Sequence, residues 1–170
     1  AFIKALRPDA LEALGRSFHL VADYANTSAS AILSPTLRRY HVDAVELNVN
    51  IDERMVFLVP AQFEAAMQRL VQITPVVGAR MGARLDTGGE KLYVVDDLGT
   101  RLHPLKALAA VTALAMRANG GGTVAVPVTA PRAFEEIAAR YGGQILRTRA
   151  TVGALMQTAP QQPDLLLLGD

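Results

Sequence analysis

The chain has 170 residues, of which 51% are hydrophobic and 19% are charged, and this balance excludes a generally disordered protein. Seventeen lysines and arginines stand against 16 aspartates and glutamates, so the formal net charge of +1 is too small for nucleic-acid binding by bulk electrostatics. The absence of cysteine excludes disulfides, thiol nucleophiles and cysteine-ligated metal sites.

The three histidines, His19, His41 and His103, lie far apart in the sequence, and none forms an HxH, HxxxH or HExxH spacing. A histidine-based metal centre is therefore not expected. The longest apolar run, residues 105–116, covers only about three helical turns, too few to span a bilayer. Because the N-terminal segment also lacks the pattern of a signal peptide, we expect a cytoplasmic protein with no membrane and no nucleic-acid partner.

Short β-prone runs alternate with amphipathic helical segments along the chain. The first half is expected to form a helix over residues 10–16, a strand over 19–22, a helix that Ser28 or Ser30 caps and that ends near residue 40, and a strand over 42–47. An irregular loop over 48–59 precedes a helix that begins at Pro60 and places Phe63, Ala66, Met67 and Leu70 on one face. Two strands follow over 79–85 and 91–95, and the Gly88-Gly89 pair between them signals a hairpin.

The second half continues the alternation. A long helix begins at Pro104 and ends near residue 118, where Asn-Gly-Gly-Gly at 119–122 provides a C-cap. A strand over 123–128, a helix over 131–141 closed by two glycines, a strand over 144–147, a short helix over 151–158 and a last strand over 165–168 complete the pattern.

This order predicts an α/β fold made of two small three-layer α/β/α domains with mixed sheets. The boundary falls near residues 99–104, so we expect one domain over residues 1–102 and a second over 103–170. The chain does not begin with Met, and its last strand-like run stops abruptly, so both ends are expected to be cuts through a longer protein.

The turn between the two hairpin strands carries the first candidate chemistry. Asp86 and Glu90 stand four residues apart on a Gly-rich turn and offer carboxylate oxygens to a hard cation such as Mg²⁺. The alternative is a plain hairpin turn with two solvated carboxylates.

Several arginines follow predicted strands and are candidates for holding a phosphate. Arg147 and Arg149 come at the carboxyl end of a strand, where α/β sheets bind ligands, although they also suit an exposed surface. Residues 129–132 open a helix and offer either an anion cradle or, more simply, an N-cap. Arg80 and Arg84 share one face of their strand, which we expect to face solvent or an interface rather than a site.

The stretch GARMGARLDTGGEKL at residues 78–92 resembles the metal loop of the α-D-phosphohexomutases (the phosphoglucomutase/phosphomannomutase family), where Gly-Ala-Asp-x-Gly is followed by Asp-Gly-Asp-Gly-Asp-Arg. Further runs are similar to family motifs in the same order: VADYAN at 21–26, VELN at 45–48, VVDDLG at 94–99, FEEIA at 134–138 and GGQILRT at 142–148. The resemblance implies that the chain comprises the second and third of four domains, with the third cut off at the sugar-recognition loop that begins at Asp170.

The departures from this pattern suggest a loss of catalysis. The resemblance places the family's three metal aspartates at Asp86, Gly88 and Glu90, so the middle carboxylate is missing, and Lys91 stands where the family has an arginine. It also places Arg149 where the family has a lysine on the substrate side. The phosphoserine of the family belongs to its first domain, so no catalytic residue and no cofactor are expected in this fragment.

A degenerate form of this module is fused to mannose-1-phosphate guanylyltransferase-like proteins, which the present sequence resembles at the turn 23–26, the loop 52–54, residues 127–132 and Leu155-Met156. This resemblance implies a non-catalytic sugar-phosphate-binding or regulatory module, with the absent flanking domains of the parent chain as partners. It leaves Lys91, Arg147, Arg149 and Asp170 as candidates for binding a hexose phosphate. The alternatives are the central part of an active Mg²⁺-dependent phosphohexomutase, and a module that has lost ligand binding and keeps only an interface.

Overall fold

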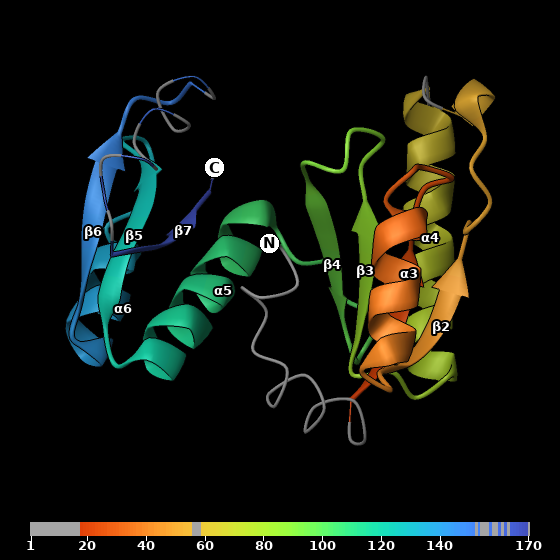
Figure 1. The fold of residues 1–170 in the computed structure, drawn as a ribbon, viewed down its shortest axis with the longest axis horizontal. Coiled ribbons are helices and arrows are strands. Elements are labelled where there is room, and N and C mark those ends of the chain that lie inside the picture. Colours follow the sequence, from red (N-terminus) through yellow and green to blue (C-terminus); the bar gives the residue numbers. More distant parts are fainter. Residues whose placement is uncertain are drawn as a thin grey trace. The chain divides into compact units, whose positions relative to one another are not determined.

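The computed structural model describes residues 18–55, 59–151, 153, 157, 160, 162 and 164–169. It divides into two compact units, Ala1–Leu102 and His103–Asp170, each with its own sheet (Figure 1). The α/β class predicted from the sequence is confirmed. The helix expected over 10–16 and most of the one expected over 151–158 lie outside the described residues.

The first unit is built on a mixed four-stranded sheet. Its strands are β1 (His19–Asp23), β2 (Asp43–Leu47), β3 (Met81–Leu85) and β4 (Leu92–Asp96). They lie in the order β2-β1-β3-β4, with β1 parallel to both β2 and β3 and with β4 antiparallel to β3. The hairpin predicted from the Gly88-Gly89 pair is therefore confirmed.

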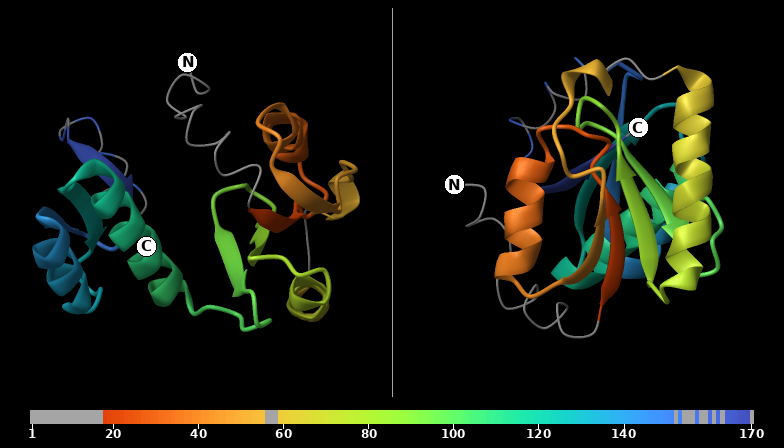
Figure 2. Two further views of the ribbon diagram at one scale, coloured as in Figure 1. Left: turned by 90° about the horizontal axis from the view of Figure 1, so that it is seen from below. Right: turned by 90° about the vertical axis from the view of Figure 1, so that its right-hand side faces the viewer.

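Two helices cover opposite faces of this sheet (Figure 2). They are α3 (Ser30–Arg39), which connects β1 to β2, and α4 (Pro60–Val76), which connects β2 to β3; a short 3₁₀ helix, η1 (Glu53–Met55), precedes α4. The prediction of a serine N-cap for α3 is wrong, because Ala29 occupies that position without a side-chain cap. The Ser30 hydroxyl instead donates to the Thr27 carbonyl, within the turns that lead into the helix.

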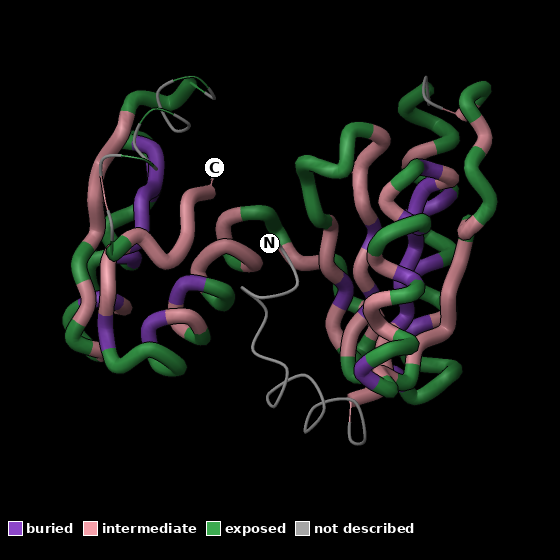
Figure 3. Tube along the Cα trace, viewed as in Figure 1, coloured by how far each residue is buried: buried purple, intermediate pink, exposed green. Residues whose placement is uncertain are grey.

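The core of the first unit lies between α4 and the sheet. Figure 3 shows buried positions along the central strands and exposed positions on the outer turns of the helices. The buried face of α4 consists of Ala66, Met67, Leu70 and Thr74. Three of the four residues predicted for the inner face of this helix are therefore buried. The remaining one, Phe63, packs edge-on against Tyr93 of β4 with ring centroids 4.8 Å apart.

Close packing of α4 on β3 depends on Gly82. A Cβ at this position would overlap Thr74 Oγ1 and would lie 3.0 Å from Leu70 Cδ1. Thr74 is fully buried, and its hydroxyl donates to the Leu70 carbonyl. The glycine therefore lets the helix approach the strand.

We expect Gly82→Ala to lower the free energy of unfolding by about 1–3 kcal/mol, because the added methyl group forces α4 away from β3. Gly88→Ala is the matched control, since its Cβ would meet its nearest neighbour, Glu90 Cγ, at 3.6 Å. Urea denaturation measures both. Equal stability of the two variants would contradict this account of the packing.

The second unit contains a three-stranded sheet among its described residues. Its strands are β5 (Gly122–Pro127), β6 (Gly143–Thr148) and β7 (Leu165–Leu168), which lie in the order β6-β5-β7 and all run parallel. The helices α5 (Pro104–Asn119) and α6 (Ala133–Tyr141) pack against each other and share one core with the strands. Both helices end at a left-handed glycine, Gly120 or Gly142, as their sequences predict. No helix in the described part of the chain is long and apolar enough to cross a membrane.

Candidate functional site

The carboxyl ends of β1, β2 and β3 form the edge of the first sheet where a ligand is expected. The chain leaves β1 through α3 to reach β2 on one side, and returns through α4 to reach β3 on the other side of β1. Strands β1 and β3 are therefore neighbours at a topological switch point, and open α/β sheets bind ligands outside the carboxyl ends of such strands.

An ion pair between Asp23 and Arg84 is buried at this edge. The two residues are register partners on the parallel strands β1 and β3, and Arg84 Nη1 donates to Asp23 Oδ2. The side chains are only 2% and 4% exposed, respectively. The other carboxylate oxygen, Oδ1, accepts the backbone N–H of Ala25 at 2.9 Å and the side-chain amide of Asn48 at 2.7 Å.

The sequence-based expectation that Arg84 faces solvent or an interface is wrong. Helix α4 covers that face of β3, so a side chain pointing there is buried. An arginine is tolerated in this position because the neighbouring strand places a carboxylate beside it. Arg80, four residues earlier, precedes β3 and is exposed, as expected.

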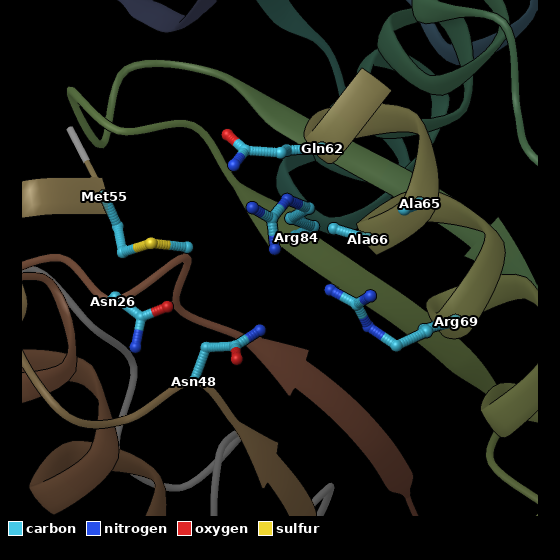
Figure 4. Close-up of a pocket in the computed structure, with 8 residues that line it drawn as sticks. All are labelled: Asn26, Asn48, Met55, Gln62, Ala65, Ala66, Arg69 and Arg84. Atoms are coloured by element: carbon cyan, nitrogen blue, oxygen red, sulfur yellow. The ribbon is translucent and has the colours of Figure 1, made fainter. Parts of the chain in front are cut away.

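A pocket of about 160 Å³ lies beside this ion pair (Figure 4). Its lining comes from the loops after β1 and β2, from η1, from β3 and from α4. The lining residues are Asn26, Asn48, Met55, Gln62, Ala65, Ala66, Arg69 and Arg84. In Figure 4, the side chains of Met55, Gln62, Arg69 and Asn48 extend towards the space around Arg84.

The backbone next to the pocket adopts unusual conformations. Ala25, Asn26 and Asn48 have φ angles of 54°, 61° and 52°, in the left-handed region that residues other than glycine rarely adopt. Their conformations are held by hydrogen bonds, from Ala25 N to Asp23 and from Asn26 N to the Asn48 carbonyl at 3.0 Å. Backbone strain of this kind clusters at functional sites.

We expect Asp23→Ala to lower the free energy of unfolding by about 3–5 kcal/mol, because the substitution leaves Arg84 as a buried charge without a counter-ion. Asp43→Ala, which removes an exposed carboxylate paired with His19 in the same sheet, should cost at most about 1 kcal/mol. Urea denaturation compares the two variants. A loss as small for Asp23→Ala as for Asp43→Ala would contradict the structural role of the pair.

The structure brings the predicted metal residues together in the turn between β3 and β4. Asp86 Oδ1 accepts the backbone N–H groups of Glu90 and Lys91 at 2.8 and 3.0 Å. A Cβ built on Gly88 would lie 3.8 Å both from Asp86 Oδ2 and from Glu90 Cδ. The two carboxyl groups thus flank the position where a third would project, and one of their four oxygens is occupied by the backbone.

This donor set does not fit a resident Mg²⁺. No group of three or more His, Asp or Glu side chains that could hold a metal ion occurs among the described residues. The two carboxylates are on a solvent-exposed turn, and an ion held by only two such groups must draw its remaining ligands from water or a bound phosphate.

In the second unit, Arg147 holds the loop between β5 and α6 in place. Its Nε and Nη2 donate to the two oxygens of the Glu135 carboxylate at 2.8 Å each. Its Nη1 donates to the carbonyls of Pro127 and Ala130, and Nη2 also reaches the Pro131 carbonyl. The hydrogen bonds from Arg147 hold the pKa of Glu135 below its ordinary value.

This arrangement changes the interpretation of the loop over residues 129–132. The side-chain N-cap suggested by the sequence is absent, because Arg132 occupies the N-cap position of α6 without a side-chain cap. The loop turns several carbonyls towards the Arg147 guanidinium. All five N–H groups of Arg147 therefore have acceptors within the protein.

The other predicted phosphate-binding residues are differently placed. Lys91 is exposed immediately before β4 in the first unit, and Arg149 is exposed just after β6 in the second unit. Asp170 lies outside the described residues. The pairing of Asp23 with Arg84 and the pocket lined by Arg69 were missed at the sequence level; an arginine within a strand that is expected to be covered by helices was the available signal.

Comparison with known proteins gives relatives of one kind. The chain is 25% identical over 130 residues to a phosphoglucomutase/phosphomannomutase of Thermococcus kodakarensis, a match that covers 76% of this chain and 28% of the relative. It is also 25% identical over 141 residues to a phosphoglucosamine mutase of Methanococcus maripaludis, covering 80% of this chain and 31% of that protein. The chain is phosphohexomutase-like. It spans about a third or less of the length of these relatives, and no family model matches it.

Solved structures show the same fold. A phosphoglucomutase/phosphomannomutase family protein from Burkholderia thailandensis superposes with a TM-score of 0.73 at 19% identity, over 94% of this chain and 37% of that one. A putative phosphomannomutase from Thermus thermophilus superposes with a TM-score of 0.75 at 14% identity, over 96% of this chain and 37% of that one. The phosphohexomutase-like chain thus shares the α/β architecture of these proteins over nearly its whole length.

Proposed function

We propose that this phosphohexomutase-like chain is a non-catalytic sugar-phosphate-binding or regulatory module of a mannose-1-phosphate guanylyltransferase-type protein, which acts in sugar-nucleotide metabolism in the cytoplasm. The two units would correspond to the second and third domains of the phosphohexomutases. The observation that carries the proposal is the turn at Asp86–Lys91, which is closed by hydrogen bonds to Asp86 but has a glycine at its centre.

The chemistry of phosphoryl transfer explains why that glycine matters. Catalysis of this reaction depends on neutralising the charge on the phosphoryl oxygens, commonly with a metal ion. Asp86 and Glu90 alone are a weak ligand set, and Asp86 already uses one oxygen to shape the turn. A turn of this composition is consistent with a module that binds its ligand without transferring phosphate.

Two exposed cations support sugar-phosphate binding. Lys91 follows the turn that connects β3 to β4 in the first unit, and Arg149 follows the carboxyl end of β6 in the second unit. No hydrogen bond or ion pair of either side chain is recorded among the described residues, so both are available to a phosphate group. Arg147 is a weaker candidate because its N–H groups are all engaged.

The alternative is the central part of an active Mg²⁺-dependent phosphohexomutase. It is favoured by one feature, the approach of the Asp86 and Glu90 carboxyl groups to the same point beside Gly88. The coding sequence upstream of Ala1 separates the two proposals: a nucleotidyltransferase supports the regulatory module, whereas a first mutase domain with its phosphoserine supports the enzyme.

We expect no saturable heat when Mg²⁺ is titrated into this chain by calorimetry up to millimolar concentration, because two carboxylates alone do not replace the ion's hydration shell. Asp86→Ala is the control. Saturable binding to the unchanged chain that disappears in Asp86→Ala would overturn the proposal of a non-catalytic module and favour the enzyme.

The double variant Thr87→Gly, Gly88→Asp should bind Mg²⁺, because it adds a carboxylate between the two present.

We expect Arg149→Ala to weaken binding of a hexose phosphate by roughly 10- to 100-fold, the usual effect of losing a charged hydrogen bond. Arg117→Ala is the matched control, because Arg117 is an exposed arginine at the end of α5 in the same unit. Calorimetry with hexose 1- and 6-phosphates measures both variants. An affinity unchanged by Arg149→Ala would exclude this residue as a phosphate ligand.

A further inference from the structure

We propose that the pocket beside the Asp23–Arg84 pair binds a phosphate group, either as inorganic phosphate or as a phosphate monoester, with Arg69 as its principal ligand. The proposal goes beyond the function proposed above and does not depend on it. It uses neither the Asp86–Lys91 turn nor Arg149, and its site lies wholly within the first unit.

The charge balance of the pocket favours an anion. The positive charge of Arg84 is compensated by Asp23, but Arg69 lines the pocket with no ion pair or hydrogen bond recorded to any described residue. No acidic residue lines the pocket. Of the acidic residues in the neighbouring segments, Asp52 pairs with Arg54 and Glu64 with Arg101, while Glu53 of η1 is exposed and lies outside the lining. One uncompensated guanidinium therefore gives the pocket a net positive charge.

The polar groups of the lining match the two kinds of hydrogen bond that a phosphate makes. The Arg69 guanidinium and Gln62 Nε2 are donors without a partner among the described residues, and Gln62 Oε1 accepts from Val59 N. The side-chain N–H groups of Asn26 and Asn48 are directed to Asn50 O and to Asp23. This leaves the two asparagine oxygens free to accept from a P–OH group or from a hydroxyl of an esterified sugar.

An unsatisfied buried group adds a second, independent observation. Arg84 Nε is buried and has no hydrogen-bond partner among the described residues, although the Arg84 side chain is only 4% exposed. Leaving a buried charged donor unpaired is costly, so such a group calls for a ligand or an ordered solvent molecule. Arg84 lines the pocket from β3, and Arg69 faces it from α4 (Figure 4).

The position in the fold agrees with this chemistry. The pocket lies at the carboxyl edge of β1, β2 and β3, at the switch point of the sheet. The residues with positive φ angles, Asn26 and Asn48, contribute to its lining. Gln62 belongs to the first turn of α4, where the positive end of the helix dipole also favours an anion.

The test is a titration of the 170-residue chain with sodium phosphate at constant ionic strength, followed by ¹H–¹⁵N NMR. We expect saturable shifts of the Asn26, Asn48 and Arg84 amides and of the Arg69 side-chain N–H. No saturable shift at millimolar phosphate, or shifts confined to the second unit, would overturn the proposal. Glucose 6-phosphate in a parallel titration separates the two sources: tighter binding than phosphate identifies a monoester, and equal binding identifies the free anion.

Two substitutions at exposed positions test the ligand without disturbing the core. Arg69→Gln should weaken phosphate binding about tenfold or more, as expected when a charge-assisted hydrogen bond is lost. Its matched control is Arg39→Gln, which removes one exposed arginine from α3 and should leave the affinity unchanged. An equal loss of phosphate affinity in both variants would mean that only the net charge of the chain matters, and it would contradict a specific site.

The substitution Ala65→Glu tests the pocket in a second way. A carboxylate at this lining position stands four residues before Arg69 on α4, so it neutralises the guanidinium while adding a favourable helical ion pair. We expect phosphate binding to be lost while the fold is retained. Ala61→Glu adds the same charge to the same helix outside the lining and should bind as the unchanged chain does; retention of binding in Ala65→Glu would contradict the assignment.

Discussion

The buried ion pair between Asp23 and Arg84 is the constraint on which the first unit depends. It joins the two strands that meet at the switch point of the sheet, and it does so beneath α4, where both side chains are almost fully buried. Burying two charges is costly, and hydrogen bonds to their remaining polar atoms reduce that cost. Asp23 accepts such hydrogen bonds from Ala25 N and the Asn48 amide, which in turn holds the loops after β1 and β2 in their left-handed conformations.

The second unit places an arginine at an equivalent point of its own sheet with a different result. Arg147 is the last residue but one of β6, as Arg84 is of β3, and each side chain organises the carboxyl edge of its sheet. Arg147 uses every N–H group on a carboxylate and on loop carbonyls, so it fixes the start of α6 and leaves nothing for a ligand. Arg84 donates from Nη1 to the Asp23 carboxylate, and it also borders a pocket. Similar residues therefore hold a loop in place in one unit and border a pocket in the other.

The turn at Asp86–Lys91 is shaped by its own hydrogen bonds. Asp86 accepts two backbone N–H groups, so its carboxylate stabilises the hairpin whether or not an ion is bound. Gly88, midway between Asp86 and Glu90, carries no side chain, and the turn is open to solvent. A phosphohexomutase-like architecture is thus combined with a turn that offers two carboxylates, Asp86 and Glu90, on either side of a glycine.

The sequence by itself determined the α/β class, the order of strands and helices, the hairpin at Gly88-Gly89, the glycine caps of α5 and α6, and the resemblance to the phosphohexomutases. These features depend on local periodicity, turn chemistry and short motifs, which can be recognised within a few residues. It misjudged Arg84 and the caps of α3 and α6, and it missed the pocket at Arg69. Asp23 and Arg84 stand 61 residues apart, and only the parallel pairing of β1 with β3 makes them neighbours. The tertiary structure decided the site because burial, and therefore the meaning of a charged side chain, depends on which helix covers it.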